Sequence, residues 1–148
     1  MRKRYLDDRQ LGAFIAGFGM MPLSRIWFGD YLALYLELGA SVGVYQRSRR
    51  TKHERHIFAG YDWLLTDNVG TEMPRSDMTE SLILKLLGNS RVLCVSLDSR
   101  EELLVRFDND CQLRTWGTEH PEWSLWEHPN KNVSYENGRP TLEIDQLE

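Results

Sequence analysis

The sequence predicts an α+β fold that is mainly antiparallel β: two β-meander repeats and a C-terminal hairpin, with one or two short helices. Apolar and polar residues alternate with a period of two in several short runs, which turn residues separate. Helical spacing is confined to two short stretches, and an Asn-Gly pair near the C-terminus is a strong hairpin signal. The 148 residues, 41% of them apolar, suit a single domain over residues 1–148.

The first expected element is a short helix over residues 7–15. Asp7 or Asp8 would cap its N-terminus, because a side-chain carboxylate there accepts from free backbone N–H groups. Gly17 or Gly19 would end it. The apolar face, at helical spacing, holds Leu11, Phe14 and Ile15, which predicts packing against a sheet.

A three-stranded meander is expected over residues 20–46. Residues 24–28 would form its first strand, followed by a turn at Gly29 and Asp30. Apolar residues alternate along residues 32–36, and after an interruption at Gly39 the alternation resumes at Val42 and Val44.

The stretch 47–56 is too basic to be buried, so we expect a long edge strand or an exposed hairpin. A solvated charge run is its usual explanation, and phosphate or nucleic-acid binding is the functional alternative. Its two histidines, His53 and His56, lack the i, i+4 spacing of a helical zinc motif and have cationic neighbours, so no metal site is expected. The basic residues of the stretch are Arg47, Arg49, Arg50, Lys52 and Arg55.

The strongest helix signal follows at residues 77–88. Asp77 and Glu80 have the spacing of a capping box, and Gly88 stands where a left-handed residue ends a helix. The apolar stripe between them is Leu82, Ile83, Leu86 and Leu87.

A second meander is expected over residues 91–117, with strands at 93–97 and 103–107, turns at 98–101 and 108–110, and a third strand at Leu113. An offset of 71 residues carries the alternation of the first meander onto the second, which suggests an internal pseudo-repeat. The alternative is that any two amphipathic hairpins look alike.

The last strands are expected at residues 123–126, 133–135 and 141–144, with Asn137 and Gly138 forming the final turn. The whole chain is thus expected to contain about eight strands. Pro140 is acceptable only near an edge or a strand end. Trp123 and Trp126 differ by three positions, so a regular pleat sends them to opposite faces.

Composition excludes several classes of protein. No apolar run approaches the ~18 residues that span a bilayer, and the basic start leads into acid rather than the apolar core of a secretory signal. The two cysteines, Cys94 and Cys111, follow no CxxC spacing, so we expect reduced thiols in a cytoplasmic protein.

The charge is uneven along the chain. Residues 1–97 hold 13 basic and 10 acidic residues, whereas residues 98–148 hold 5 basic and 12 acidic ones. A net acidic chain is a poor general nucleic-acid binder, and its acidic part would attract a basic partner instead. The plain alternative is that these carboxylates serve solubility.

Motifs for catalysis are not found. The chain has no GxSxG, P-loop or GxGxxG sequence, so no catalytic residue and no cofactor is expected. One enzymatic alternative stays open: His120 and His128 flank the tryptophans and, beside a glutamate, could perform acid–base work in a small cleft.

Residues 103–113 (LLVRFDNDCQL), then residues 121–125 (PEWSL), resemble a family of small bacterial proteins in which an "L-x-F-D-[DN]-G" turn precedes "x-E-[SA]-W-x-L". Residues 87–92 and 28–39 resemble other parts of the same family. Several members are encoded beside polymorphic or contact-dependent growth inhibition toxins and are regarded as immunity proteins. Asp110 departs from the pattern, because it replaces the usual turn glycine.

The resemblance implies an immunity protein that binds a cognate toxin domain in the cytoplasm and covers its active site or substrate surface. A nuclease toxin must be basic to hold its substrate, so acidic residues beside an aromatic anchor would provide the contact. The alternatives are the small enzyme with a His120/His128 cleft and a regulatory binding module that uses residues 47–56. The expected toxin contacts are Asp98, Glu101, Glu102, Asp108, Asp110, Glu119, Glu122 and Trp123.

Overall fold

The computed structural model describes residues 2–30, 33–60, 62–115, 122–136 and 139–144. Strands dominate this part of the chain. In chain order the elements are β1 (Arg2–Tyr5), α1 (Asp8–Ala16), β2 (Leu23–Phe28), β3 (Leu34–Val44), β4 (Thr51–Ala59), β5 (Trp63–Thr66), β6 (Glu72–Pro74), the 3₁₀ turn η2 (Arg75–Asp77), α2 (Glu80–Leu87), β7 (Val92–Leu97), β8 (Leu103–Phe107), β9 (Gln112–Thr115), β10 (Trp123–Glu127), β11 (Lys131–Glu136) and β12 (Arg139–Ile144).

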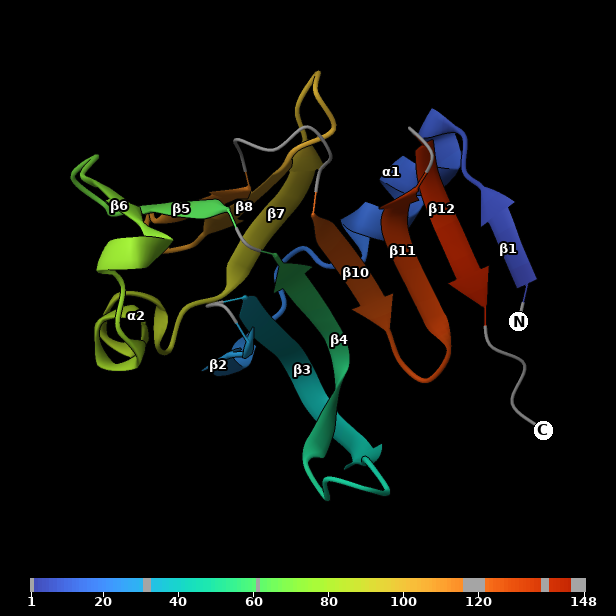
Figure 1. The fold of residues 1–148 in the computed structure, drawn as a ribbon, viewed down its shortest axis with the longest axis horizontal. Helices are drawn as coiled ribbons and strands as arrows, with labels where there is room; N and C mark the ends of the chain where they lie inside the picture. Colours follow the sequence, from blue (N-terminus) through green and yellow to red (C-terminus); the bar gives the residue numbers. More distant parts are fainter. Residues whose placement is uncertain (1, 31–32, 61, 116–121, 137–138, 145–148) are drawn as a thin grey trace.

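The strands form two antiparallel sheets (Figure 1). One has seven strands in the order β1-β12-β11-β10-β4-β3-β2, and the other has five in the order β6-β5-β9-β8-β7. The predicted α+β class, mainly antiparallel β with two short α-helices, is therefore confirmed. The expected number of about eight strands is too low, because the short strands β1, β5 and β6 carry no clear alternation.

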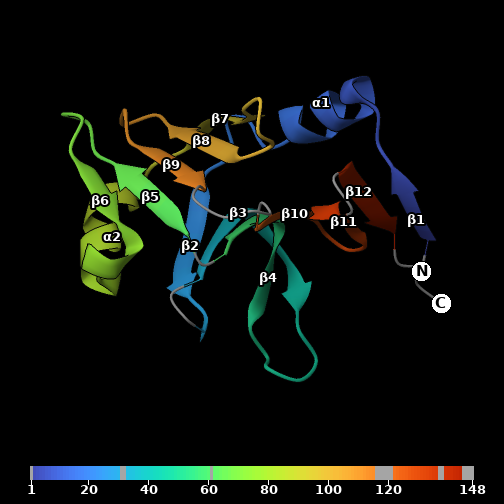
Figure 2. The ribbon, with the colours of Figure 1, turned by 45° about the horizontal axis from the view of Figure 1, so that its top comes forward.

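The five-stranded sheet and α1 lie on the same side of the seven-stranded sheet (Figure 2). One hydrophobic core fills the space between these layers and includes residues of both sheets. On β3, Leu34, Leu36 and Leu38 are all fully buried, as the alternation of a half-covered sheet requires. Val105 of β8 and Leu113 of β9 reach the same core from the other sheet.

The first meander is correct in kind but wrong in its third strand. Val42 and Val44 continue β3 rather than starting a new strand, because the chain passes Gly39 in an irregular stretch of the ladder at a positive φ of 84°. The third strand is β4, which belongs to the basic stretch and pairs with both β3 and β10. The edge strand is therefore wrong, and the exposed hairpin is confirmed for residues 47–50 only, because residues 51–56 are half-buried in β4.

The second meander lies where it was predicted, as β7, β8 and β9. The two meanders belong to different sheets. The offset of 71 residues places Gly39, inside β3, on Asp110, in the turn between β8 and β9, so the two do not correspond residue by residue at this point.

The two helices differ in how well their ends were predicted. Asp7 caps α1 in a full capping box with Gln10, and Gly17 follows the helix as predicted. In α2 the cap is Thr79, not Asp77, because Asp77 belongs to the 3₁₀ turn. Gly88 has a φ of −57°, and Asn89 takes the left-handed conformation instead.

The C-terminal strands are confirmed as β10, β11 and β12. The predicted turn at residues 137–138 lies outside the described residues, and the register pairs Glu136 with Arg139 on either side of it. Pro140 is the second residue of β12, near the strand's start as expected. Cys94 is exposed and Cys111 is buried, and both are free thiols. In the part of the chain described here, no helix has the length and apolarity to cross a membrane.

Candidate functional site

Five of the seven predicted acidic contacts fall on two turns at opposite ends of β8. Asp98, Glu101 and Glu102 belong to the turn between β7 and β8, and Asp108 and Asp110 belong to the turn between β8 and β9. A strand of five residues separates the two turns by roughly 17 Å. The structure therefore does not bring all of these carboxylates together.

Two of the predicted contacts are buried, so they cannot touch a partner. Trp123 is 2% exposed, and its Nε1 donates a hydrogen bond of 2.7 Å to the backbone oxygen of Glu101. Glu102 is 6% exposed and accepts a hydrogen bond of 2.5 Å from Thr115 Oγ1. Both residues hold the turn that carries the exposed Asp98. Glu119 lies outside the described residues, and Glu122 is half-buried at the start of β10.

Asp98 and Glu101, in the turn between β7 and β8, face the start of α1 across an open groove of about 420 Å³. We call it the acidic groove. Asp8, Asp98 and Glu101 line it, and the apolar residues Leu11 and Val95 are part of its wall. Burial, and then the charges of Asp8 and Asp98, raise the pKa of the Glu101 carboxyl. Within the described ranges, none of the three carboxylates pairs with a cation.

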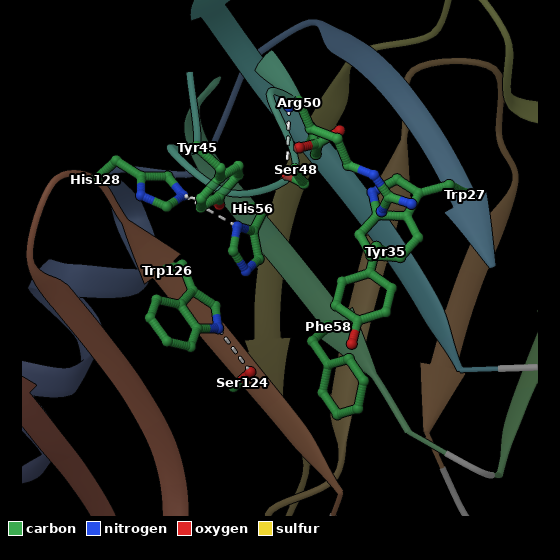
Figure 3. Close-up of a pocket in the computed structure, with 11 residues that line it drawn as sticks. Trp27, Tyr35, Tyr45, Ser48, Arg50, His56, Phe58, Ser124, Trp126 and His128 are labelled. Atoms are coloured by element: carbon green, nitrogen blue, oxygen red, sulfur yellow. Dashed lines mark hydrogen bonds between the residues drawn. The ribbon is translucent and has the colours of Figure 1, made fainter. Parts of the chain in front are cut away.

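A second site lies on the opposite, uncovered face of the seven-stranded sheet, and the sequence did not predict it. A pocket of about 540 Å³ opens there, which we call the aromatic pocket (Figure 3). Its residues alternate with core residues along β3, β4 and β10, so Tyr35 points outward between Leu34 and Leu36. The β3–β4 hairpin closes one side. The lining is Trp27, Tyr35, Glu37, Tyr45, Ser48, Arg50, His56, Phe58, Ser124, Trp126 and His128.

One wall of the aromatic pocket is a stack of planar groups. The rings of Trp27 and Tyr35 are parallel within 2°, with their centroids 3.9 Å apart. The guanidinium carbon of Arg50 lies 4.7 Å from the centroid of the Trp27 ring, a cation–π distance. Figure 3 shows these three side chains together on one side of the pocket.

The other wall consists of Trp126, His56 and His128, which stand across from Trp27 in Figure 3. The rings of His56 and Trp126 stack at 5.1 Å, and their residues are register partners on β4 and β10. His128 Nε2 lies 3.2 Å from His56 Nδ1 and 3.2 Å from the hydroxyl of Tyr45. This wall therefore combines ring surface with hydrogen-bonding atoms.

Both imidazoles of this wall are held in the neutral form near neutral pH. Burial, and then the charge of His128, lower the pKa of His56 from 6.5 to about 3. Burial also lowers the pKa of His128, and the charges of Lys52 and His53 act in the same direction. The alternative cleft with His120 and His128 stays a prediction, because His120 lies outside the described residues.

The pocket contains two buried polar atoms without a hydrogen-bond partner, Nε1 of Trp27 and Oε2 of Glu37. Glu37 is 5% exposed, with Arg25 Nε 3.8 Å from Oε2 and His53 Nδ1 3.8 Å from Oε1. Buried polar groups normally find a hydrogen-bond partner, so the Trp27 donor without one favours a ligand that supplies an acceptor, whereas Glu37 Oε2 already forms an ion pair with Arg25.

Among the described residues, no group of three or more His, Cys, Asp or Glu side chains could hold a metal ion. Comparisons of the chain with protein-family models, with curated proteins and with solved structures found no match. The resemblance to immunity proteins therefore stays a prediction, and the geometry of the two sites is what functional proposals can use.

Proposed function

We propose that this protein is an immunity-type inhibitor that binds a basic toxin domain, most simply a nuclease, in the cytoplasm. The observation that carries the proposal is the acidic groove: three carboxylates surround an open depression with an apolar wall, and no cation of the described chain neutralises them. The resemblance of the sequence to immunity proteins supports the same class of partner.

The raised pKa of Glu101 supports a cationic occupant. Its ionised form is disfavoured by burial and by two like charges, so a lysine or arginine that enters the groove relieves repulsion as well as forming an ion pair. A nuclease surface is basic because it must neutralise phosphates. A negative surface on the inhibitor accelerates its encounter with such a domain.

The groove also gives Trp123 and Glu102 a different role from the predicted one. Trp123 fixes the backbone of Glu101, and Glu102 fixes the strand that follows through Thr115. In the proposed complex they preorganise the acidic turn rather than contacting the toxin, which lowers the entropic cost of binding.

The experiment uses the product of the neighbouring gene, which the proposal expects to carry a toxin domain. The purified domain and the inhibitor should form a stable complex, and co-expression should rescue cells that the toxin stops. Removing two charges in Asp8→Asn/Glu101→Gln should lower the association rate about tenfold at low salt and weaken rescue. The matched control, Glu72→Gln/Asp77→Asn, removes two exposed acidic charges on elements that do not line the groove and should leave both unchanged.

Two outcomes contradict this proposal. If the wild-type protein binds no neighbouring toxin domain and rescues no cells, the proposed function is wrong. If the groove variant and the control associate equally fast, inhibition does not use the acidic groove. Circular dichroism of both variants separates a folding defect from a binding defect.

A further inference from the structure

We propose that the aromatic pocket binds a nucleotide, with its base against the aromatic walls and its phosphate at Arg50 and Lys52. This site lies on the face of the seven-stranded sheet opposite the core, away from the acidic groove, so the inference does not depend on the proposed function. It rests on the shape, the charge and the unpaired atoms of the pocket.

The walls suit a flat ring. Two stacked pairs line the pocket from two sides: Trp27 and Tyr35 on one side, and His56 and Trp126 on the other. Phe58 lies on β4, opposite Tyr35 in the register. Stacking of a base on an aromatic side chain stabilises the complex and tolerates any base. The cavity volume of about 540 Å³ is within the usual range for small-molecule sites.

Two cations belong to this region: Arg50 lines the pocket, and Lys52 lies beside it against the lining residue Tyr45. Arg50 lies over Trp27, and Lys52 Nζ lies 5.0 Å from the ring centroid of Tyr45. In the described ranges neither takes part in an ion pair. The fork of a guanidinium matches two phosphate oxygens, and a lysine adds a point charge. The site therefore offers positive charge beside ring surface, which favours a ligand that joins an anion to a planar group.

Two atoms of the pocket have hydrogen-bonding capacity that the protein does not use, although Glu37 Oε2 also forms an ion pair with Arg25. Glu37 Oε2 can accept from ring N–H or amino groups, and Trp27 Nε1 can donate to a ring nitrogen or carbonyl. Guanine offers two adjacent donors on one edge, which a carboxylate can accept together. Adenine offers only an amino group there. We therefore expect a guanine nucleotide to bind more tightly than an adenine nucleotide, through Glu37.

The pocket adjoins a second cavity, and this leaves two sources for the nucleotide. The second cavity, about 560 Å³, shares Tyr35, Phe58 and Ser124 with the aromatic pocket. It also contains Asn132, whose buried Oδ1 has no hydrogen-bond partner. A free nucleotide would fill the first cavity alone. A single-stranded RNA would place a second base in the adjoining one.

The experiment measures quenching of tryptophan fluorescence, since Trp27 and Trp126 line the pocket. The probes are GMP, AMP, guanosine, inorganic phosphate and short oligo-G strands. We expect GMP to bind at least about tenfold more tightly than guanosine, because one charge-assisted contact is worth about 1.5–3 kcal/mol. Affinity that rises from GMP to the dinucleotide assigns the site to a strand, and equal affinity assigns it to the free nucleotide.

Variants test the placement of each group. Arg50→Gln should remove most of the preference for GMP over guanosine, and Glu37→Gln should remove the preference for GMP over AMP. The control Arg114→Gln, an exposed arginine of β9 in the other sheet, should change neither. Asp8→Asn/Glu101→Gln should also bind GMP normally, which keeps this test separate from that of the acidic groove.

Three results would overturn the inference: no saturable quenching by any nucleotide at millimolar concentration, equal binding of GMP and guanosine to the wild type, or unchanged GMP preference in Arg50→Gln. If Glu37→Gln does not fold, Trp126→Leu provides a second variant. Trp126 is half-exposed, and its replacement should weaken all nucleotides together through lost stacking.

Discussion

At the scale of single residues, the two neutral histidines of the aromatic pocket make stability depend on pH. The folded protein binds a proton at His56 only near pH 3, whereas the unfolded chain binds it near pH 6.5. The unfolded state therefore gains more protons as the pH falls through this window, and stability must decrease. His128, whose pKa is also lowered, contributes in the same direction.

We expect the free energy of unfolding to decline as the pH is lowered from 7.5 to 4.5, and His56→Gln to show a smaller decline. Glutamine keeps a polar side chain but binds no proton, so it removes the largest source of the difference. Urea denaturation at several pH values measures both proteins. Parallel curves for the two proteins would mean that His56 does not cause the acid sensitivity.

Trp123 and Trp126 show how much of the candidate sites the sequence could predict. The spacing of Trp123 and Trp126 predicted opposite faces, and the structure buries the first and leaves the second partly exposed beside His56. Which of the two faces the core depends on where the five-stranded sheet packs, which no local pattern contains. This is why Trp123 was expected at an interface and Trp126 was not assigned to a pocket.

At the scale of elements, the start of α2 has two candidate N-cap residues, Thr79 and Asp77, which mutation can distinguish. Thr79 Oγ1 accepts a hydrogen bond of 3.2 Å from the backbone N–H of Leu82, whereas Asp77 lies in the preceding 3₁₀ turn. We expect Thr79→Ala to destabilise the protein by about 1 kcal/mol, and Asp77→Ala to cost less than about 0.5 kcal/mol. Thermal denaturation of the two variants measures the difference. A larger loss in Asp77→Ala would restore the cap that the sequence suggested.

The turn between β8 and β9 holds a second element-scale test. Asp110 has a φ of 68°, in the left-handed region that glycine adopts without strain. We expect Asp110→Gly to keep or raise stability by up to about 1 kcal/mol, and Asp110→Ala to lower it, because alanine lacks both the freedom of glycine and the polar side chain of aspartate. Chemical denaturation of the two variants measures the free energy of unfolding. A higher free energy of unfolding in Asp110→Ala than in the parent protein would contradict this expectation.

Elements with strong alternation were predictable, and their neighbours were not. Strands β7 to β12, except for their exact ends, follow from period-two patterns and turn residues. Strand β4 was obscured because its basic residues alternate with few apolar ones, although Ile57 and Ala59 are buried. Its position between β3 and β10 comes from pairing across long stretches of chain, which sequence periodicity does not encode.

At the scale of the whole molecule, the fold places unlike charges on different faces. The acidic groove belongs to α1 and the five-stranded sheet, and the aromatic pocket belongs to the uncovered face of the seven-stranded sheet. The sequence separates an acidic third from a basic stretch, so the existence of two charged regions was predictable. The pocket itself was not, because its walls join Trp27 to His128 across most of the chain.

The shared core between the sheets predicts that the molecule unfolds as one unit. Leu36 of β3 and Val105 of β8 are both fully buried in the same hydrophobic cluster, although they belong to different sheets. If neither sheet is stable without the other, a cavity made in one must destabilise both. We expect Leu36→Ala to cost about 2–5 kcal/mol and Val105→Ala somewhat less.

Two probes report on the two sheets in the same urea titration. Tryptophan fluorescence, measured in a Trp63→Phe/Trp116→Phe background, reports on the seven-stranded sheet through Trp126, because Trp63 belongs to β5 of the other sheet. Thiol labelling of the buried Cys111, in a Cys94→Ser background, reports on the turn between β8 and β9. Both probes should give one midpoint in the parent protein, and each cavity variant should shift both midpoints equally. If Leu36→Ala moved the fluorescence transition while the labelling of Cys111 kept its midpoint, the two sheets would be separate folding units. A cavity in a core that both sheets share must destabilise both of them.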